Sequence, residues 1–141
     1  MSELEDRQQA MVEDFLIFED WTSRYQMLIS MGKELSFDPQ YQTNDYKVRG
    51  CQSQVWLHSE VKDNRIYFTG ISDSTIVSGL IAVLIKIFSG QTPQDILAAP
   101  ILFIEKMGLE KHLSPTRRNG LFHMLVSIKH RAHLALEKVD D

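Results

Sequence analysis

Gly50-Cys51-Gln52-Ser53-Gln54-Val55-Trp56-Leu57 is the stretch at which a polar turn passes into an apolar run. Glycine permits backbone angles that other residues avoid, and Gln52 and Ser53 are polar residues that rarely form a core. An apolar stretch begins at Val55. The pattern predicts a turn that presents Cys51 immediately before a β-strand.

A β-hairpin is predicted for residues 54–71, which follow this turn. Apolar and polar residues alternate there, as they do in strands that bury one face. The Lys-Asp-Asn-Arg segment at 62–65 is typical of a turn, although Asp-Asn is a weaker hairpin signal than Asn-Gly. The apolar faces comprise Val55, Leu57 and Val61 on the first strand and Ile66 and Phe68 on the second.

Helical periodicity precedes and follows the hairpin. Residues 4–31 carry apolar residues at spacings of three to four, with Asp20 as the N-cap of a second helix and Gly32 near its end. Residues 37–45 contain Pro39 and several polar residues, and they predict a loop. The expected apolar positions of the first segment are Met11, Phe15, Phe18, Trp21, Tyr25 and Leu28.

Three further helix starts follow the hairpin. Asp73 or Ser74 can cap a helix that runs to about Phe88, and Thr92 precedes proline and an acidic first turn. Ser114 precedes a proline in the same way. The buried stripe of the last helix is expected to contain Leu121, Leu125, Ile128, Ala132 and Ala135. The sequence predicts an α+β fold, with a short antiparallel β-sheet packed against several helices in a single domain over residues 1–141.

Composition narrows the function classes. The chain has 141 residues, of which 43% are hydrophobic, and a formal net charge of −4, which argues against a nucleic-acid-binding protein. The longest apolar run, residues 76–88, is too short to span a bilayer. The polar, charged start lacks the pattern of a signal peptide. One free thiol fits a reducing cytoplasm, which is the expected location.

Cys51 is the only cysteine, so it forms no internal disulfide and no multi-thiolate metal site. It remains a candidate nucleophile, covalent carrier or inert core residue, and its polar neighbours favour reactivity over packing. Arg49 can stabilise a thiolate or can be a solvated loop charge. His58 lies inside the predicted strand, where nothing local places it beside the sulfur. A thiol without a dedicated base suits exchange or carrier chemistry.

Other polar residues have both a functional and an ordinary interpretation. Arg117 lies in the first turn of the last helix, where the helix dipole disfavours a positive charge, so it either has a partner or is an exposed arginine. Asp73 is a helix cap or a contact residue. The three histidines of the last helix are expected to face solvent rather than to bind a metal. Both tryptophans are expected in the core. These residues are His123, His130, His133, Trp21 and Trp56.

Four further features of the sequence are blocks that occur in a fixed order: GCQSQVWL at 50–57; SD, IV and GLIA at 72–73, 76–77 and 79–82; GQTPQDI at 90–96; and HLSPTR with GL at 112–117 and 120–121. These blocks resemble the SufE-type sulfur acceptors, accessory proteins of cysteine desulfurases in iron–sulfur cluster assembly. The resemblance extends from Phe15 onward. Two positions depart from the family pattern: Ser78, where many members carry lysine, and the Tyr46-Lys47 lead-in.

The resemblance implies a SufE/IscU-like fold and a carrier rather than an independent enzyme. Cys51 would accept sulfur from the persulfide of a pyridoxal-phosphate-dependent desulfurase, stimulate that enzyme, and pass the sulfur to a cluster scaffold. The chain would need no cofactor or metal of its own. The implied contacts with the partner or within the loop are made by Arg49, Gly50, Gln52, Asp73 and Arg117.

The sequence leaves two other functions open for Cys51, and it raises the questions of oligomeric state and of how a persulfide is sheltered. A peroxidase-type thiol protein would form a sulfenic acid on Cys51, and an iron–sulfur or zinc scaffold would need more ligands than one cysteine supplies. A homodimer is possible. A persulfide also needs shelter from cellular thiols, for which Val48, Val55 and Leu57 offer apolar surface.

Overall fold

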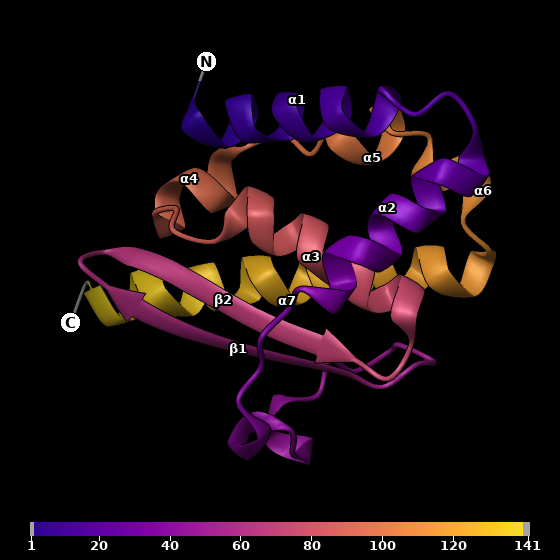
Figure 1. The fold of residues 1–141 in the computed structure, drawn as a ribbon. Coiled ribbons are helices and arrows are strands. Elements are labelled where there is room, and N and C mark those ends of the chain that lie inside the picture. Colours follow the sequence, from indigo (N-terminus) through magenta and orange to yellow (C-terminus); the bar gives the residue numbers. More distant parts are fainter. Residues whose placement is uncertain (1, 140–141) are drawn as a thin grey trace.

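The computed structural model describes residues 2–139 and, among these, the side chains up to Glu137. It has one two-stranded sheet and helices before and after it (Figure 1). The elements are α1 Glu3–Leu16, α2 Trp21–Lys33, the 3₁₀ turns η1 Pro39–Tyr41 and η2 Asn44–Tyr46, β1 Val55–Lys62, β2 Arg65–Ser72, α3 Thr75–Phe88, α4 Pro93–Ala98, α5 Phe103–Lys106, α6 Leu109–His112 and α7 Pro115–Val139. The α+β prediction is confirmed.

The hairpin forms as predicted. Strands β1 and β2 pair antiparallel with Lys62 opposite Arg65, so that only two residues form the turn. Asp63 and Asn64 both have positive φ, 53° and 62°, which is the geometry of the type I′ turn that matches strand twist. Val61 continues the face of Val55 and Leu57 but is 53% exposed, because a groove between β1 and α7 opens there.

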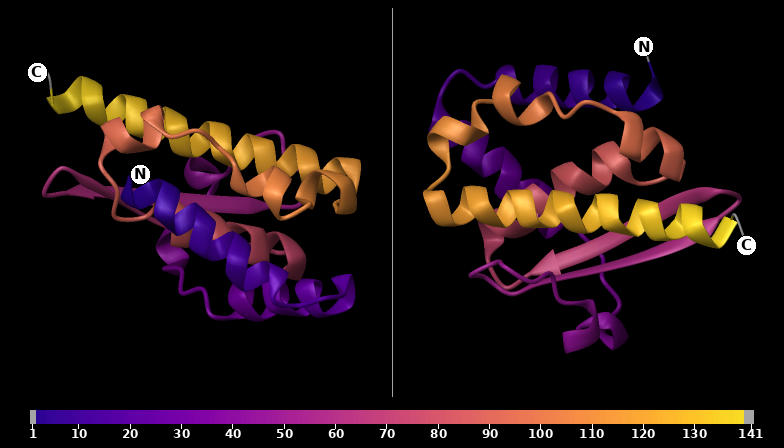
Figure 2. Two further views of the ribbon diagram at one scale, coloured as in Figure 1. Left: turned by 90° about the horizontal axis from the view of Figure 1, so that it is seen from above. Right: turned by 180° about the vertical axis from the view of Figure 1, so that it is seen from behind.

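Helix α3 is the centre of the fold. It packs against β2 on one side and against α1 and α2 on the other, and Figure 1 shows it between the hairpin and α1. Its residues are buried almost all round, as expected of a helix that is apolar on every face. Helix α7 runs along the molecule beside the hairpin, and α4 packs against it (Figure 2).

The predicted N-terminal helical segment divides into two helices. Helix α1 ends at Leu16, and the Asp20 carboxylate accepts a hydrogen bond from Ser23 N at 2.7 Å, which confirms it as the N-cap of α2. Phe18 therefore lies in the connection, 39% exposed, rather than on a helical core face. Trp21 is only partly buried, and its ring stacks on His112 at a centroid distance of 3.7 Å.

Two glycines allow α2 and α3 to cross at close range. A Cβ at Gly32 would lie 2.6 Å from Gly79 N, and a Cβ at Gly79 would overlap the Leu28 carbonyl oxygen. Gly32 is buried one residue before the end of α2, near the helix end as the sequence predicts. The crossing fixes the position of α3, whose N-terminal turn faces the loop of Cys51.

Capping follows the predicted pattern, and the structure decides between the two candidate caps of α3. The hydroxyls of Ser74, Thr92 and Ser114 accept hydrogen bonds from backbone amides of their own helices at 3.4, 3.1 and 3.3 Å. Ser74, rather than Asp73, therefore caps α3. The predicted stripe of α7 is buried throughout, and residues 37–45 form a loop containing η1 and part of η2. No helix in residues 2–139 is long and apolar enough to cross a membrane.

Candidate functional site

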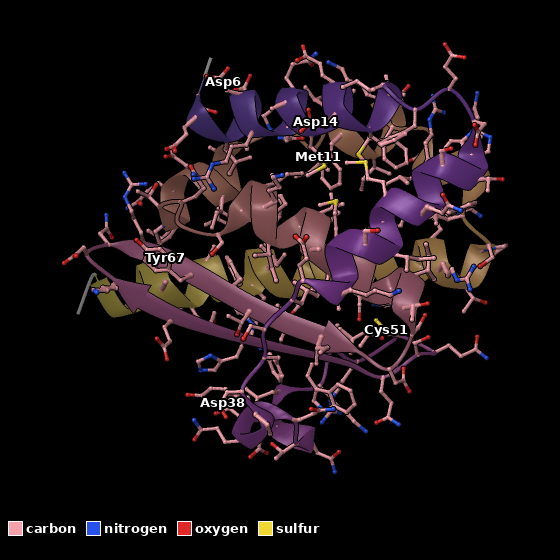
Figure 3. All side chains as sticks on the ribbon, in the orientation of Figure 1. Asp6, Met11, Asp14, Asp38, Cys51 and Tyr67 are labelled. Carbon is pink, nitrogen blue, oxygen red and sulfur yellow. The ribbon has the colours of Figure 1, made fainter. Side chains whose placement is uncertain are left out.

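Cys51 lies at the open end of the hairpin, opposite the Asp63-Asn64 turn (Figure 3). Gly50 before it has a φ of 89°, a conformation that side chains rarely adopt. This turn directs Cys51 toward the helices, where it is half-buried and packs against the hydrophobic core. The predicted turn ahead of a strand is present.

A small pocket with a volume of about 20 Å³ adjoins the thiol. Three parts of the chain meet there: the loop of Cys51, the first turn of α3, and the N-terminal part of α7. The pocket brings together three of the residues singled out by sequence, Cys51, Gln52 and Arg117. The remaining lining residues are Ser53, Val77, Thr116, Gly120 and Met124.

The thiol is held in its neutral form. Its Sγ lies 3.6 Å from the Gly120 carbonyl oxygen, to which the S–H donates a weak hydrogen bond. Burial raises the pKa of Cys51 above the usual value of a cysteine. The free protein therefore contains a protected thiol rather than an activated thiolate.

Arg117 reaches the pocket because it lies in the first turn of α7, which begins beside the Cys51 loop. Ser114 caps this helix through Arg117 N, and the Arg117 side chain is exposed at the pocket rim. The neighbouring Arg118 turns elsewhere and donates to the Glu110 carbonyl oxygen at 2.8 Å. Arg117 and the N-terminal end of the α7 dipole thus place positive charge at the rim of the pocket. A negatively charged group beside Cys51 would be stabilised there.

Asp73 secures the other end of the Cys51 loop. Its carboxylate accepts a hydrogen bond from Gln54 N at 3.0 Å, and Ser72 Oγ donates to Gln54 O at 2.7 Å. These bonds fix the residue at which the loop becomes strand β1. Arg49 is exposed and is not among the residues that line the pocket, so the structure does not place its charge beside the sulfur.

His123 is a neighbour of the loop that sequence reasoning assigned to solvent. Its side chain is exposed, but a Cβ at Gly50 would lie 2.6 Å from its ring. Gly50 is therefore required for close packing as well as for its φ. His133 lies 3.1 Å from Glu137 on the same helix. Within residues 2–137 no three potential ligands are grouped to hold a metal ion.

The apolar surface beside the sulfur differs from the one that sequence reasoning expected. Val77 and Met124 line the pocket of Cys51. Val48, Val55 and Leu57 instead line a neighbouring cavity of about 10 Å³, which shares only Met124 with the first. The helical spacing of Arg117, Gly120 and Met124 was the available signal, because residues three and four apart share one face.

Comparison with known proteins gives the family. The family model described as "SufE: Fe-S metabolism associated domain" matches residues 9–132. This chain belongs to the SufE family. The cysteine loop, the α3 start and the α7 start that form the pocket all lie within the matched residues. The family assignment associates the chain with iron–sulfur metabolism.

Individual relatives and a solved structure agree with the assignment. An uncharacterized SufE-like protein of Rhizobium meliloti is 41% identical over 127 residues, covering 86% of this chain and 91% of that protein. A chloroplastic/mitochondrial SufE-like protein of Arabidopsis thaliana is 35% identical over 144 residues, covering 100% of this chain and 39% of its own length. The solution structure of a hypothetical Thermus thermophilus protein has the same fold, with a TM-score of 0.76, 21% identity, and coverage of 93% and 96%.

Proposed function

We propose that this SufE-family protein accepts sulfur on Cys51 from a cysteine desulfurase and passes it on for iron–sulfur cluster assembly. The observation that carries the proposal is the protected thiol beside a small pocket with a cationic rim. A carrier needs a sulfur that is shielded when free yet close to the surface. Membership of the family supports the same chemistry.

The transfer is an exchange between sulfur atoms. Cys51, after giving up its proton, attacks the outer sulfur of the partner's persulfide, and an S–S bond forms on Cys51. The partner's own S–S bond breaks, and its cysteine leaves as a thiolate that takes the proton. No external oxidant is needed. The pocket of about 20 Å³ has room for about one water-sized atom beside Sγ, a suitable scale for one added sulfur.

The proposed roles divide between the two proteins. The partner is a pyridoxal-phosphate-dependent desulfurase that generates the persulfide, and this chain supplies an acceptor thiol and no cofactor. Arg117 orients the partner at the pocket, while Gly50, Gln52 and Asp73 shape the loop. A scaffold protein then takes the sulfur. We place this reaction in the cytoplasm, a reducing compartment in which a lone thiol persists.

Sulfur loading tests the proposal directly. The purified protein is incubated with a desulfurase and free cysteine, and its intact mass and the peptide containing Cys51 are measured. We expect one additional sulfur on Cys51, and its loss on treatment with a thiol reductant. Parallel samples receive peroxide, or ferrous or zinc ions. Rapid peroxide turnover or stoichiometric bound metal, without sulfur loading, would instead support the thiol peroxidase or the scaffold.

Arg117→Ala should weaken binding to the desulfurase and lower sulfur loading. The exposed guanidinium can form a bidentate pair with a carboxylate of the partner, and loss of such a pair costs about tenfold or more in affinity. Arg117→Lys should restore only part of it, because lysine lacks the planar fork. Binding is measured by titration calorimetry, and loading by mass.

Arg118→Ala is the matched control, since that side chain bonds only within the chain at the Glu110 carbonyl. Its loading should equal that of the wild type. Both alanine variants should unfold at nearly the wild-type temperature. Equal loading by Arg117→Ala and the wild type would show that Arg117 is an ordinary exposed arginine.

Alkylation should report the shelter of Cys51. Because burial raises the pKa of the folded thiol, its alkylation rate should rise at higher pH than that of the denaturant-unfolded chain. The contribution of this pKa shift to the free energy of unfolding is fully present below the pKa of Cys51 in the unfolded chain. It is lost as the pH rises through the pKa of Cys51 in the folded chain. The rate should increase in complex with a desulfurase lacking its reactive cysteine. Identical rates for folded and unfolded chains would refute the shelter.

A further inference from the structure

The free edge of β1 changes character halfway along the strand. Ile66, which lies opposite Val61, bonds away from β1: its N–H donates to Gln91 O and its carbonyl accepts from Gly90 N. In an antiparallel ladder, residues of such a pair both direct their backbone groups outward. Val61, and by the two-residue repeat Ser59 and Leu57, therefore point their N–H and C=O groups to the free edge.

The first half of this edge is already occupied. The carbonyl of Val55 accepts a hydrogen bond from Val48 N at 2.9 Å, and that of Leu57 accepts one from Arg131 at 2.8 Å. For Ser59 and Val61, no backbone partner is present on this edge among residues 2–139. A short open edge thus begins where the contacts with residues 47–48 and Arg131 end.

A groove with a volume of about 430 Å³ runs beside this open edge, between β1 and α7. Its apolar residues include Val61, 53% exposed, and Leu134, 42% exposed. Ser59, Ser127, His130, Arg131 and Ala135 complete the lining. The groove lies toward the hairpin turn and shares no lining residue with the pocket of Cys51.

Arg131 is the unbalanced charge of this groove. It donates to Leu57 O and, at 3.0 Å, to Ser59 Oγ, but it forms no ion pair with any carboxylate among residues 2–137. Burial lowers the pKa of Arg131, because desolvation disfavours the cation, and the nearby Tyr46 opposes this only in part. A guanidinium has five N–H donors, so donors remain for a ligand. A carboxylate is the planar partner that this group binds best.

We propose that this groove binds an extended acidic segment of a partner protein, which adds as a strand to the open edge of β1. Backbone groups of Ser59 and Val61 pair with the segment, and a glutamate or aspartate side chain of the segment binds Arg131. Alternate apolar side chains of the segment pack on Val61 and Leu134. The open edge and the charge of Arg131 favour the same ligand. Strand addition supplies the backbone hydrogen bonds, and the groove with Arg131 supplies the specificity for side chains of the segment.

A synthetic peptide provides the probe. It alternates threonine and valine around one central glutamate, and a matched peptide carries glutamine there. Binding is followed by nuclear magnetic resonance of the backbone amides of the full chain. We expect the amides of Ser59 and Val61 to shift and to become protected from hydrogen exchange. The glutamate peptide should bind about tenfold more tightly than the glutamine peptide, as expected for a charged hydrogen-bonded pair.

Two variants separate the backbone from the charge. Val61→Pro removes the outward N–H of residue 61, which has no partner in the described fold. This change should weaken binding of the glutamate peptide about tenfold. Val61→Thr keeps this N–H and should bind within about twofold of the wild type. Arg131→Gln should abolish the preference for glutamate over glutamine. It also removes bonds to β1, so its unfolding midpoint is measured alongside.

Several results would overturn the proposal. Equal binding by the Val61→Pro and Val61→Thr proteins would exclude strand addition. Acetate or inorganic phosphate producing the same shifts as the peptide would reduce the groove to a small-anion site. Shifts of the Ser59 and Val61 amides that depend on protein concentration, without peptide, would assign the edge to a second copy of the chain. Sulfur loading does not enter these measurements, so their failure leaves the proposed function intact.

Discussion

Replacing Cys51 by serine is expected to abolish sulfur acceptance while leaving the fold intact. The oxygen of serine is not ionised near neutral pH and cannot carry sulfane sulfur, so no persulfide can form. The thiol makes only one weak hydrogen bond, to the Gly120 carbonyl, which a serine hydroxyl can also approach. Loading of sulfur should fall to background by mass, and stimulation of the desulfurase should disappear.

Ser53→Ala is the matched control for this change. Ser53 lines the same pocket but carries no group able to hold sulfur, so its removal should leave loading largely intact. Thermal unfolding of both variants should stay close to the wild type. Full stimulation of the desulfurase by Cys51→Ser would eliminate the carrier role and leave a protein that activates its partner by contact alone.

Gly79→Ala should be the most destabilising single methyl addition among the described glycines. The new Cβ would overlap the Leu28 carbonyl oxygen, and this oxygen belongs to helix backbone that cannot rotate away. Overpacking of this kind costs about 1–3 kcal/mol and sometimes more. The free energy of unfolding, from urea titration, should fall by about 3 kcal/mol, near the upper end of that range.

Gly120→Ala provides the comparison, because this glycine also lies inside a helix. A Cβ there would meet Cys51 Sγ at 3.7 Å, an ordinary contact. Removing a helix-interior glycine should stabilise the protein by about 0.5–1 kcal/mol. If Gly79→Ala were as stable as the wild type, the close crossing of α2 and α3 would be incorrect.

Local features of the fold could be predicted from the sequence. The Asp63-Asn64 turn and the Asp20, Thr92 and Ser114 caps depend on residues within three or four positions, where propensity and hydrogen bonding act directly. The buried stripe of α7 follows from its 3.6-residue period. Asp73 and Ser74 were both possible caps, and two contacts decided between them: Ser74 Oγ accepts from Val77 N, whereas the Asp73 carboxylate accepts from Gln54 N.

Contacts between distant residues could not be predicted in this way. The approach of Arg117 and Gly120 to Cys51 depends on where α7 starts relative to the hairpin. Val61 belongs to an apolar face by its period, yet it is exposed because α7 diverges from β1 there and leaves a groove. The contribution of Val77 and Met124 to the pocket likewise arises from packing.

Helix α7 has a consequence that depends only on its length. Thr116 and Arg117 near its start line the thiol pocket, and Leu134 near its end lines the groove. At a rise of about 1.5 Å per residue these ends lie about 25 Å apart, a distance that about eight extended residues can bridge. A folded partner docked at the thiol and its own flexible tail could therefore bind together, and two weak contacts would combine as one avid attachment.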